Sequence, residues 1–145
     1  MPPAGAAEII ARLGLEPHPE GGHFRELYRR PAATGARSSM TSIYYLLAAG
    51  ERSAWHRLRT ADEIWYFHAG AAVSLWLSGD GKVRAEHRLG PEPTQEQSPQ
   101  VLVPAGIWQS ARPHGAWALV DCAVTPGFEF ADFELAPAAF SPQPA

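Results

Sequence analysis

Cysteine and lysine are almost absent from this sequence, and it contains no long hydrophobic run. Cys122 is the single cysteine, which excludes an internal disulfide and indicates a reducing compartment. Lys82 is the single lysine, the arginines are scattered and the net charge is −3, so nucleic acid is not an expected partner. No apolar run approaches the ~18 residues of a membrane-spanning helix, and the N-terminus lacks the pattern of a signal peptide. We therefore expect a cytoplasmic protein without a membrane partner.

The composition that remains is typical of one folded domain. The 145 residues are 46% hydrophobic and 19% charged, enough for one substantial core. Apolar residues at helical spacing in residues 5–13, followed by Gly14, predict a short helix within residues 1–14. Short alternating runs separated by Gly and Pro then predict an all-β domain over residues 15–135. The Pro- and Ala-rich residues 136–145 are expected to form a loose tail.

Residues 50–70 carry the clearest chemical signal, in two predicted strands joined by a tight connection. Because side chains alternate between faces along a strand, His56 shares a face with Leu58, and Glu63 shares a face with Trp65 and Phe67. If these two faces meet inside a barrel, a titratable pair lies on an aromatic floor in an otherwise apolar interior. The sequence therefore predicts a pocket with ionisable groups.

The same residues resemble a known family. The pattern G-x5-H-x-L-x4-E-x6-G from Gly50 to Gly70 is similar to the first cupin motif, and PAGIWQ at residues 104–109 is similar to the second. With PHPEGGHFRELYR, TSIYYLL and VTPGFEFADFEL, the chain is identified as a member of the cupin-5 (DUF985) family from Leu15 to Leu135. The resemblance implies a double-stranded β-helix, the cupin jelly-roll barrel, and a homodimer.

The resemblance also locates the positions at which other cupins bind metal. Metal-binding cupins use three histidines and a glutamate, whereas these positions here hold His56, Leu58, Glu63 and Gln109. Leucine cannot ligate a metal, and a glutamine amide is a neutral, weak ligand. We therefore expect no cofactor and no tight metal site. The alternative is a weakly bound divalent ion held by His56, Glu63 and Gln109 together with waters.

The candidate catalytic residues are His56, Glu63 and Tyr44. His56 would act as a general base, Glu63 would orient its ring, and the Tyr44 hydroxyl would be an acid or an oxyanion donor. The alternative for the pair is a self-satisfied buried contact that fixes strand register. Tyr44 and Tyr45 point to opposite faces, so only one of them can face inward, and a core role is the alternative there.

The candidate ligand-binding residues are Glu20, Arg25, Trp65, Phe67 and Gln109. Glu20 and Arg25 flank Gly21-Gly22, a pair that permits a positive φ or a close backbone approach, as in a loop folded over a barrel mouth. Trp65 and Phe67 would form pocket walls, or serve only as core. Gln109 would bind a ligand carbonyl or hydroxyl, or hold His56 or Glu63 in place.

Three functions are compatible with these residues. The first is a metal-independent epimerase or isomerase acting on a small polar, sugar-like or sugar-nucleotide ligand. A loose resemblance of HPEGGHFRELY to the metal-free sugar-nucleotide 3,5-epimerases supports it. The second is a non-catalytic cupin that only binds such a ligand. The third is a metal-dependent cupin enzyme with a reduced ligand set, against which Leu58 counts.

Overall fold

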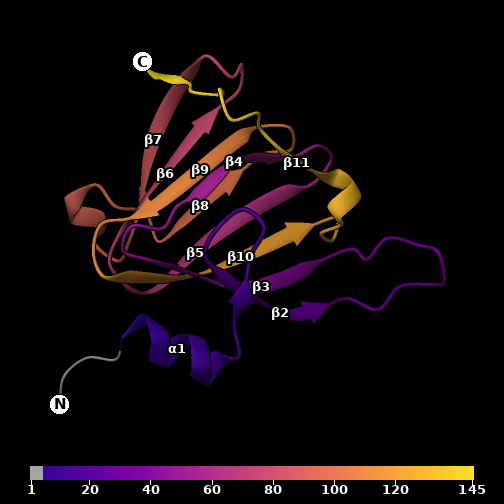
Figure 1. The fold of residues 1–145 in the computed structure, drawn as a ribbon. Helices are drawn as coiled ribbons and strands as arrows, with labels where there is room; N and C mark the ends of the chain where they lie inside the picture. Colours follow the sequence, from indigo (N-terminus) through magenta and orange to yellow (C-terminus); the bar gives the residue numbers. More distant parts are fainter. Residues whose placement is uncertain (1–4) are drawn as a thin grey trace.

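Two six-stranded β-sheets face each other and make up most of the molecule (Figure 1). The computed structural model describes residues 5–145. One sheet has the strand order β1-β2-β3-β10-β5-β8, and the other has the order β11-β4-β9-β6-β7-β12. The predicted all-β jelly-roll class is confirmed. The strands are β1 (Glu16–Pro17), β2 (His23–Arg29), β3 (Thr41–Ala48), β4 (Ser53–Leu58), β5 (Asp62–Gly70), β6 (Val73–Ser78), β7 (Val83–Leu89), β8 (Gln100–Val103), β9 (Trp108–Pro113), β10 (Trp117–Thr125), β11 (Phe133–Leu135) and β12 (Gln143–Pro144).

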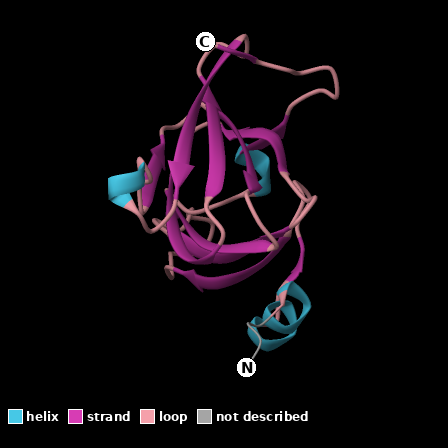
Figure 2. Ribbon diagram, turned by 90° about the vertical axis from the view of Figure 1, so that its left-hand side faces the viewer, coloured by secondary structure: helices cyan, strands magenta, loops and turns pink. Residues whose placement is uncertain are grey.

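The helical segments lie outside the two sheets. The helix α1 (Ala6–Leu13) ends at Gly14, whose φ of 65° allows the left-handed turn that stops it. It has no buried residue and lies beyond the curved strands (Figure 2). The 3₁₀ turns are η1 (Pro93–Gln95) in the β7–β8 loop and η2 (Phe130–Asp132) before β11. No helix in residues 5–145 has the length and apolar character needed to cross a bilayer.

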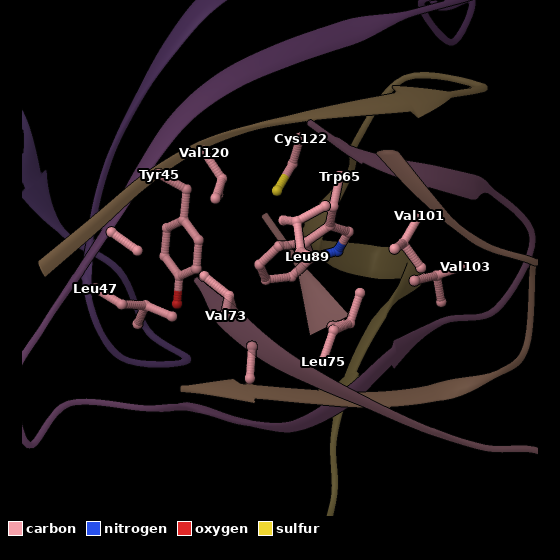
Figure 3. Packing of buried hydrophobic residues seen from close by; sticks show 12 residues of the cluster. Tyr45, Leu47, Trp65, Val73, Leu75, Leu89, Val101, Val103, Val120 and Cys122 are labelled. Carbon is pink, nitrogen blue, oxygen red and sulfur yellow. The ribbon is translucent and has the colours of Figure 1, made fainter. Parts of the chain in front are cut away.

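Strand alternation determines which side chains form the core. Along β10, Ala118, Val120, Cys122 and Val124 are buried between the sheets, while Asp121 faces the other way. Around them pack Tyr45, Trp65 and the aliphatic residues of β6 and β8, which fill one part of the interior (Figure 3). The other part of the interior is occupied by a smaller apolar cluster and by titratable side chains.

The C-terminal segment, which is expected from its composition to be loose, makes several contacts with the second sheet. The Ala136 amide donates to the Trp55 carbonyl, and the Phe140 ring packs on Trp108 at a centroid distance of 4.8 Å. The segment then adds β12 in parallel to β7. The alanine and proline side chains do not provide these contacts, which come from backbone groups and the Phe140 ring. One aromatic residue and a few backbone hydrogen bonds are enough to dock the segment on the second sheet.

Candidate functional site

A cavity of about 250 Å³ opens between the two sheets at the end where β4 and β5 are joined. We call it the Glu63 cavity. Its polar lining includes the side chains of His18, Glu20, His56 and Glu63. Its apolar lining includes four phenylalanines, Phe24, Phe128, Phe130 and Phe133. The predicted strand alternation thus corresponds to a cavity lined by both His56 and Glu63.

The β1–β2 loop brings Glu20 into this cavity, and two glycines allow it to do so. Gly21 and Gly22 have φ values of 107° and 76°. A Cβ on Gly21 would lie 2.2 Å from the Arg52 carbonyl oxygen, so only glycine permits this close approach. The Ala54 amide donates to the Glu20 carbonyl at 2.7 Å, which fixes the loop against β4. The Glu20 side chain is thereby held inside the molecule, with 7% of its surface exposed.

His56 is bonded to protein atoms at both ring nitrogens. Nε2 lies 2.9 Å from Oε2 of Glu20, and Nδ1 lies 2.7 Å from the Ala54 carbonyl oxygen. A carbonyl oxygen can only accept, so Nδ1 carries a proton. The ring also stacks on Phe133 at a centroid distance of 5.3 Å. Its direct partner is therefore Glu20 rather than the predicted Glu63, and neither nitrogen is free to take a proton from a ligand.

Electrostatics make His56 and Glu20 an ion pair at neutral pH. Burial would lower the pKa of His56, but the Glu20 charge, its hydrogen bond and the Glu63 charge raise this pKa to about 9. Burial would likewise raise the pKa of Glu20, yet the adjacent His56 and His18 lower it below its usual range. An imidazolium and a carboxylate therefore face each other in the buried interior.

The pKa of Glu63 is shifted in the opposite direction from that of Glu20. Burial, with a contribution from the Glu20 charge, raises the pKa of its carboxyl to about 7, although His56 and the Gln109 hydrogen bond lower it in part. Oε1 of Glu63 accepts from the Gln109 side-chain amide at 2.8 Å. Gln109 in turn accepts from the Trp65 indole at 2.9 Å. Glu63 is thus positioned by a buried chain of hydrogen bonds and titrates near neutral pH.

His18 is a member of the cavity that sequence reasoning did not select. Its Nδ1 accepts from the Glu20 amide at 3.0 Å, so the neutral ring carries its proton on Nε2. Burial lowers the pKa of His18, which keeps the ring neutral. A signal was present in the sequence, because His18 lies two residues before Glu20 in the PHPEGG loop. The phenylalanines of FEFADF, residues 128–133, carry part of the family resemblance and also line the cavity.

Two predicted site residues, Tyr44 and Arg25, lie outside the Glu63 cavity. Tyr44 pairs with Arg25 and Asp121 on neighbouring strands, on the face of the sheet opposite the buried Tyr45. The Arg25 guanidinium donates to the Leu13 carbonyl beneath α1. Neither Tyr44 nor Arg25 lines the cavity, because strand alternation directs both outward.

Trp65, Phe67 and Gln109 form the layer behind the cavity. Trp65 and Gln109 are fully buried, and they reach the cavity only through the hydrogen bond to Glu63. Phe67 packs against the apolar core. None of the three side chains lines the cavity: Trp65 and Gln109 support Glu63 through hydrogen bonds, and Phe67 belongs to the apolar core.

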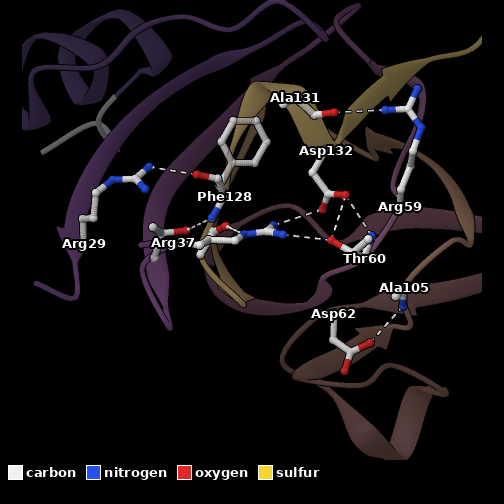
Figure 4. Close-up of polar contacts among 11 residues, drawn as sticks. Arg29, Arg37, Arg59, Thr60, Asp62, Ala105, Phe128, Ala131 and Asp132 are labelled. Carbon is white, nitrogen blue, oxygen red and sulfur yellow. Dashed lines mark hydrogen bonds and ion pairs between the residues drawn. The ribbon is translucent and has the colours of Figure 1, made fainter. Parts of the chain in front are cut away.

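A partly buried network of hydrogen bonds holds the segment that carries the phenylalanines (Figure 4). Arg37 donates to the Gly127 carbonyl at 2.8 Å and to Asp132 at 3.1 Å. Asp132 also accepts from the amide and the hydroxyl of Thr60, each at 2.9 Å. The β2–β3 loop, the β4–β5 turn and η2 are thereby tied together beside the cavity. This network positions Phe128, Phe130 and Phe133.

The donor atoms at the cupin metal positions do not fit a metal ion. His56 uses both nitrogens for Glu20 and Ala54, and Leu58 is apolar. The Gln109 amide oxygen accepts from Trp65. Among the described residues, no three His, Cys, Asp or Glu side chains are arranged to hold a metal.

Both the sequence and the fold of the chain match known proteins. A family model described as "Cupin superfamily (DUF985)" matches residues 7–136, and the chain belongs to this family. A crystal structure of a Shewanella oneidensis protein shares 40% identity, with 92% of this chain and 85% of that chain covered and a TM-score of 0.87. A hypothetical protein from Leishmania major shares 30% identity over 94% and 90% of the two chains, with a TM-score of 0.84.

A more distant structure has a functional name. The dTDP sugar isomerase from Desulfovibrio desulfuricans G20 shares 16% identity, covers 82% of this chain and 83% of that chain, and has a TM-score of 0.59. At this identity the similarity shows the fold alone. No protein among the curated sequences matches the chain significantly.

Proposed function

We propose that this protein is a metal-independent isomerase or epimerase that moves a proton on a small, uncharged, sugar-like carbonyl compound. The observation that carries the proposal is Glu63, a buried carboxyl that lines the cavity and has a pKa raised to about 7. A general base or acid works best when its pKa lies near the working pH. The roles differ from those predicted from sequence, because Glu63 rather than His56 transfers the proton.

The proton transfer follows from the arrangement of charges. The Glu63 carboxylate takes the proton from the carbon next to a ligand carbonyl. The electron pair of that C–H bond forms the C=C bond of the enolate, and the π pair of the carbonyl moves onto its oxygen. Within the His56–Glu20 pair, the His56 imidazolium is the group that stabilises the enolate electrostatically, and its charge also acts on Glu63. Glu63 then returns the proton to the former carbonyl carbon, while the hydroxyl proton of the first carbon passes to the former carbonyl oxygen, and the ligand becomes its isomer. Return to the same carbon gives an epimer only when it occurs on the opposite face, and otherwise it gives solvent exchange alone. The overall reaction changes neither the net charge of the ligand nor its overall oxidation state, so no oxidant is required.

The cavity selects the size and charge of the ligand. Its volume of about 250 Å³ is below the ~300–1,000 Å³ of sites for drug-sized molecules, which favours a single small ring or chain. Four carboxylates line it, at Glu16, Glu20, Glu26 and Glu63, and its lining contains no arginine or lysine. A phosphate would be repelled there. We therefore favour a free sugar-like carbonyl compound over a sugar nucleotide, with the phenyl rings contacting its apolar face.

The name of the dTDP sugar isomerase is consistent with the same reaction type on this fold, although its identity to the chain is only 16%. A cupin that only binds its ligand would use the same cavity. The two functions differ in one property, since a binding protein exchanges no carbon-bound proton of its ligand. The test must therefore follow exchange and binding separately.

The experiment is solvent exchange in D₂O. Free aldoses and ketoses are incubated with the protein, and the loss of the signal of the proton next to the carbonyl is followed by NMR. We expect exchange with the wild type and a loss of roughly 100-fold or more with Glu63→Gln, the usual scale for removal of a general base. Glu92→Gln, in an exposed loop, is the matched control and should retain the wild-type rate.

Ligand binding is measured on the same samples by line broadening. If Glu63→Gln still exchanges the proton at the wild-type rate, Glu63 is not the group that transfers it. Binding by the wild type without any exchange would overturn the enzymatic proposal in favour of a binding protein. Tight binding of sugar nucleotides, with none of free sugars, would contradict the proposed ligand class.

A further inference from the structure

A second hollow, separate from the Glu63 cavity, has a volume of about 710 Å³. It lies beside β6, β7 and β9, which Figure 1 shows as neighbouring strands, and beside the β3–β4 loop. It shares no lining residue with the Glu63 cavity. Its polar and aromatic side chains are those of Glu51, Arg52, Trp76, Arg84, Arg112 and His114. We call it the arginine groove.

The arginines of this groove differ from most others in the chain. Six of the eleven arginines form ion pairs with carboxylates: Arg12, Arg29, Arg37, Arg57, Arg59 and Arg88. Within residues 5–145, Arg52, Arg84 and Arg112 have no such pair. Three of the five arginines that lack a carboxylate partner therefore face one hollow. This concentration is unexpected in a protein with a net charge of −3.

Trp76 holds two of these guanidinium groups in place. The central carbon of Arg84 lies 5.3 Å from the centroid of the Trp76 ring, and that of Arg112 lies 5.5 Å from it. The two arginines come from β7 and β9, on either side of β6, so the sheet register brings them to the same indole. A cation–π contact orients a guanidinium but does not neutralise its charge. Both groups keep donors for an anion.

The carboxylate in the groove, Glu51, forms no ion pair with these arginines. Glu51 accepts from the Ala48 amide at 2.8 Å, and its other oxygen lies 3.9 Å from His23. The Arg52 side chain donates to the Ser110 hydroxyl at 3.1 Å, which positions its positive charge at the same hollow. Three positive charges that line one hollow favour the binding of an anion there.

We propose that the arginine groove binds the phosphoryl group of a small phosphorylated molecule. Planar guanidinium groups match the oxygens of phosphate with paired, charge-assisted hydrogen bonds. The volume of the groove is within the range of small-molecule sites, so an organic moiety can accompany the phosphoryl group. This site is independent of the reaction proposed for Glu63, which takes place on an uncharged ligand in another cavity.

The test is calorimetric titration at low ionic strength with three probes: inorganic phosphate, pyrophosphate and glucose 6-phosphate. We expect the wild type to bind pyrophosphate, and the variant Arg84→Gln/Arg112→Gln to lose about tenfold or more in affinity. Arg84→Lys/Arg112→Lys keeps the charge but not the planar fork, and should fall in between. Arg30→Gln is the matched control, because Arg30 is exposed and lies outside the groove. Preference for glucose 6-phosphate over pyrophosphate would identify an organic phosphate as the ligand.

Circular dichroism and thermal melting of each variant show whether a loss of affinity reflects a loss of fold. Equal pyrophosphate affinity in the wild type and in the double Gln variant would overturn the proposal, as would no binding by the wild type. Sedimentation velocity of the wild type and the double Gln variant tests the alternative that the arginines form a subunit contact. If the wild type fails to bind pyrophosphate and the double variant loses self-association, the arginines form a subunit contact and the proposal is wrong.

Discussion

The pH dependence of stability in Glu63→Gln tests the electrostatic basis of the proposed reaction. The pKa of Glu63 is raised from its ordinary value of 4.5 to about 7 in the folded protein. Between these values the folded chain keeps a proton that the unfolded chain has lost. The stabilising contribution of Glu63 is therefore complete below pH 4.5 and is lost as the pH rises through 7. At about 1.4 kcal/mol per pH unit, the loss approaches about 3 kcal/mol.

Glutamine is uncharged at every pH, so the variant escapes this loss. Its side-chain oxygen can still accept from the Gln109 amide, which preserves the contact that positions residue 63. The Glu63 charge also contributes to the raised pKa of His56, and the variant loses that attraction. We therefore expect the free energy of unfolding of the variant, relative to the wild type, to increase by about 1–3 kcal/mol between about pH 5 and about pH 8.5.

The assay is urea denaturation at several pH values, followed by tryptophan fluorescence. Glu92→Gln provides the baseline, because an exposed glutamate should give a curve parallel to that of the wild type. A constant difference between Glu63→Gln and the wild type across the pH range would refute the reasoning. Glu63 would then ionise as it does in water, and its role as the proton-transferring group would lose its physical basis.

Two further predictions concern His56. Glu20→Gln should lower the pKa of His56 from about 9 to below 6.5, because burial then outweighs the remaining attraction. NMR titration of the ring checks this, with Glu16→Gln as the control, and an unchanged pKa would contradict it. Leu58→His alone should not create a tight Ni²⁺ site, because both nitrogens of His56 are engaged. The double variant Leu58→His/Glu20→Ala should retain Ni²⁺ after dialysis, as measured by elemental analysis. Equal Ni²⁺ retention by Leu58→His alone would show that His56 is already free to bind a metal.

The sequence predicts the part of the site that depends on strand alternation. A period of two places His56 and Glu63 correctly because each lies within a single regular strand. The same rule leaves Tyr44 and Tyr45 undecided, since it separates them by face without stating which face is inward. Pairing of β3 with β10 decides this, because it aligns Tyr45 with the buried Val120. That register depends on contacts between segments far apart in the chain.

The pairing of Glu20 with His56 could not be predicted by periodicity, because Glu20 lies in a loop. The glycines after it indicate an unusual backbone but not the surface against which the loop folds. In the structure that surface is the start of β4, where the Glu20 carbonyl accepts from Ala54.

The Glu20 contact changes the chemistry of the whole site. Because Glu20 takes the proton-bearing Nε2 of His56, the imidazole becomes a fixed cation rather than a base. The cation also lowers the pKa of Glu63, which burial has raised, so that it lies near 7. The division of roles between histidine and glutamate therefore follows from a loop whose position is set by tertiary contacts. Assigning the general base by resemblance to a histidine-dependent epimerase would select the residue whose lone pair is already used.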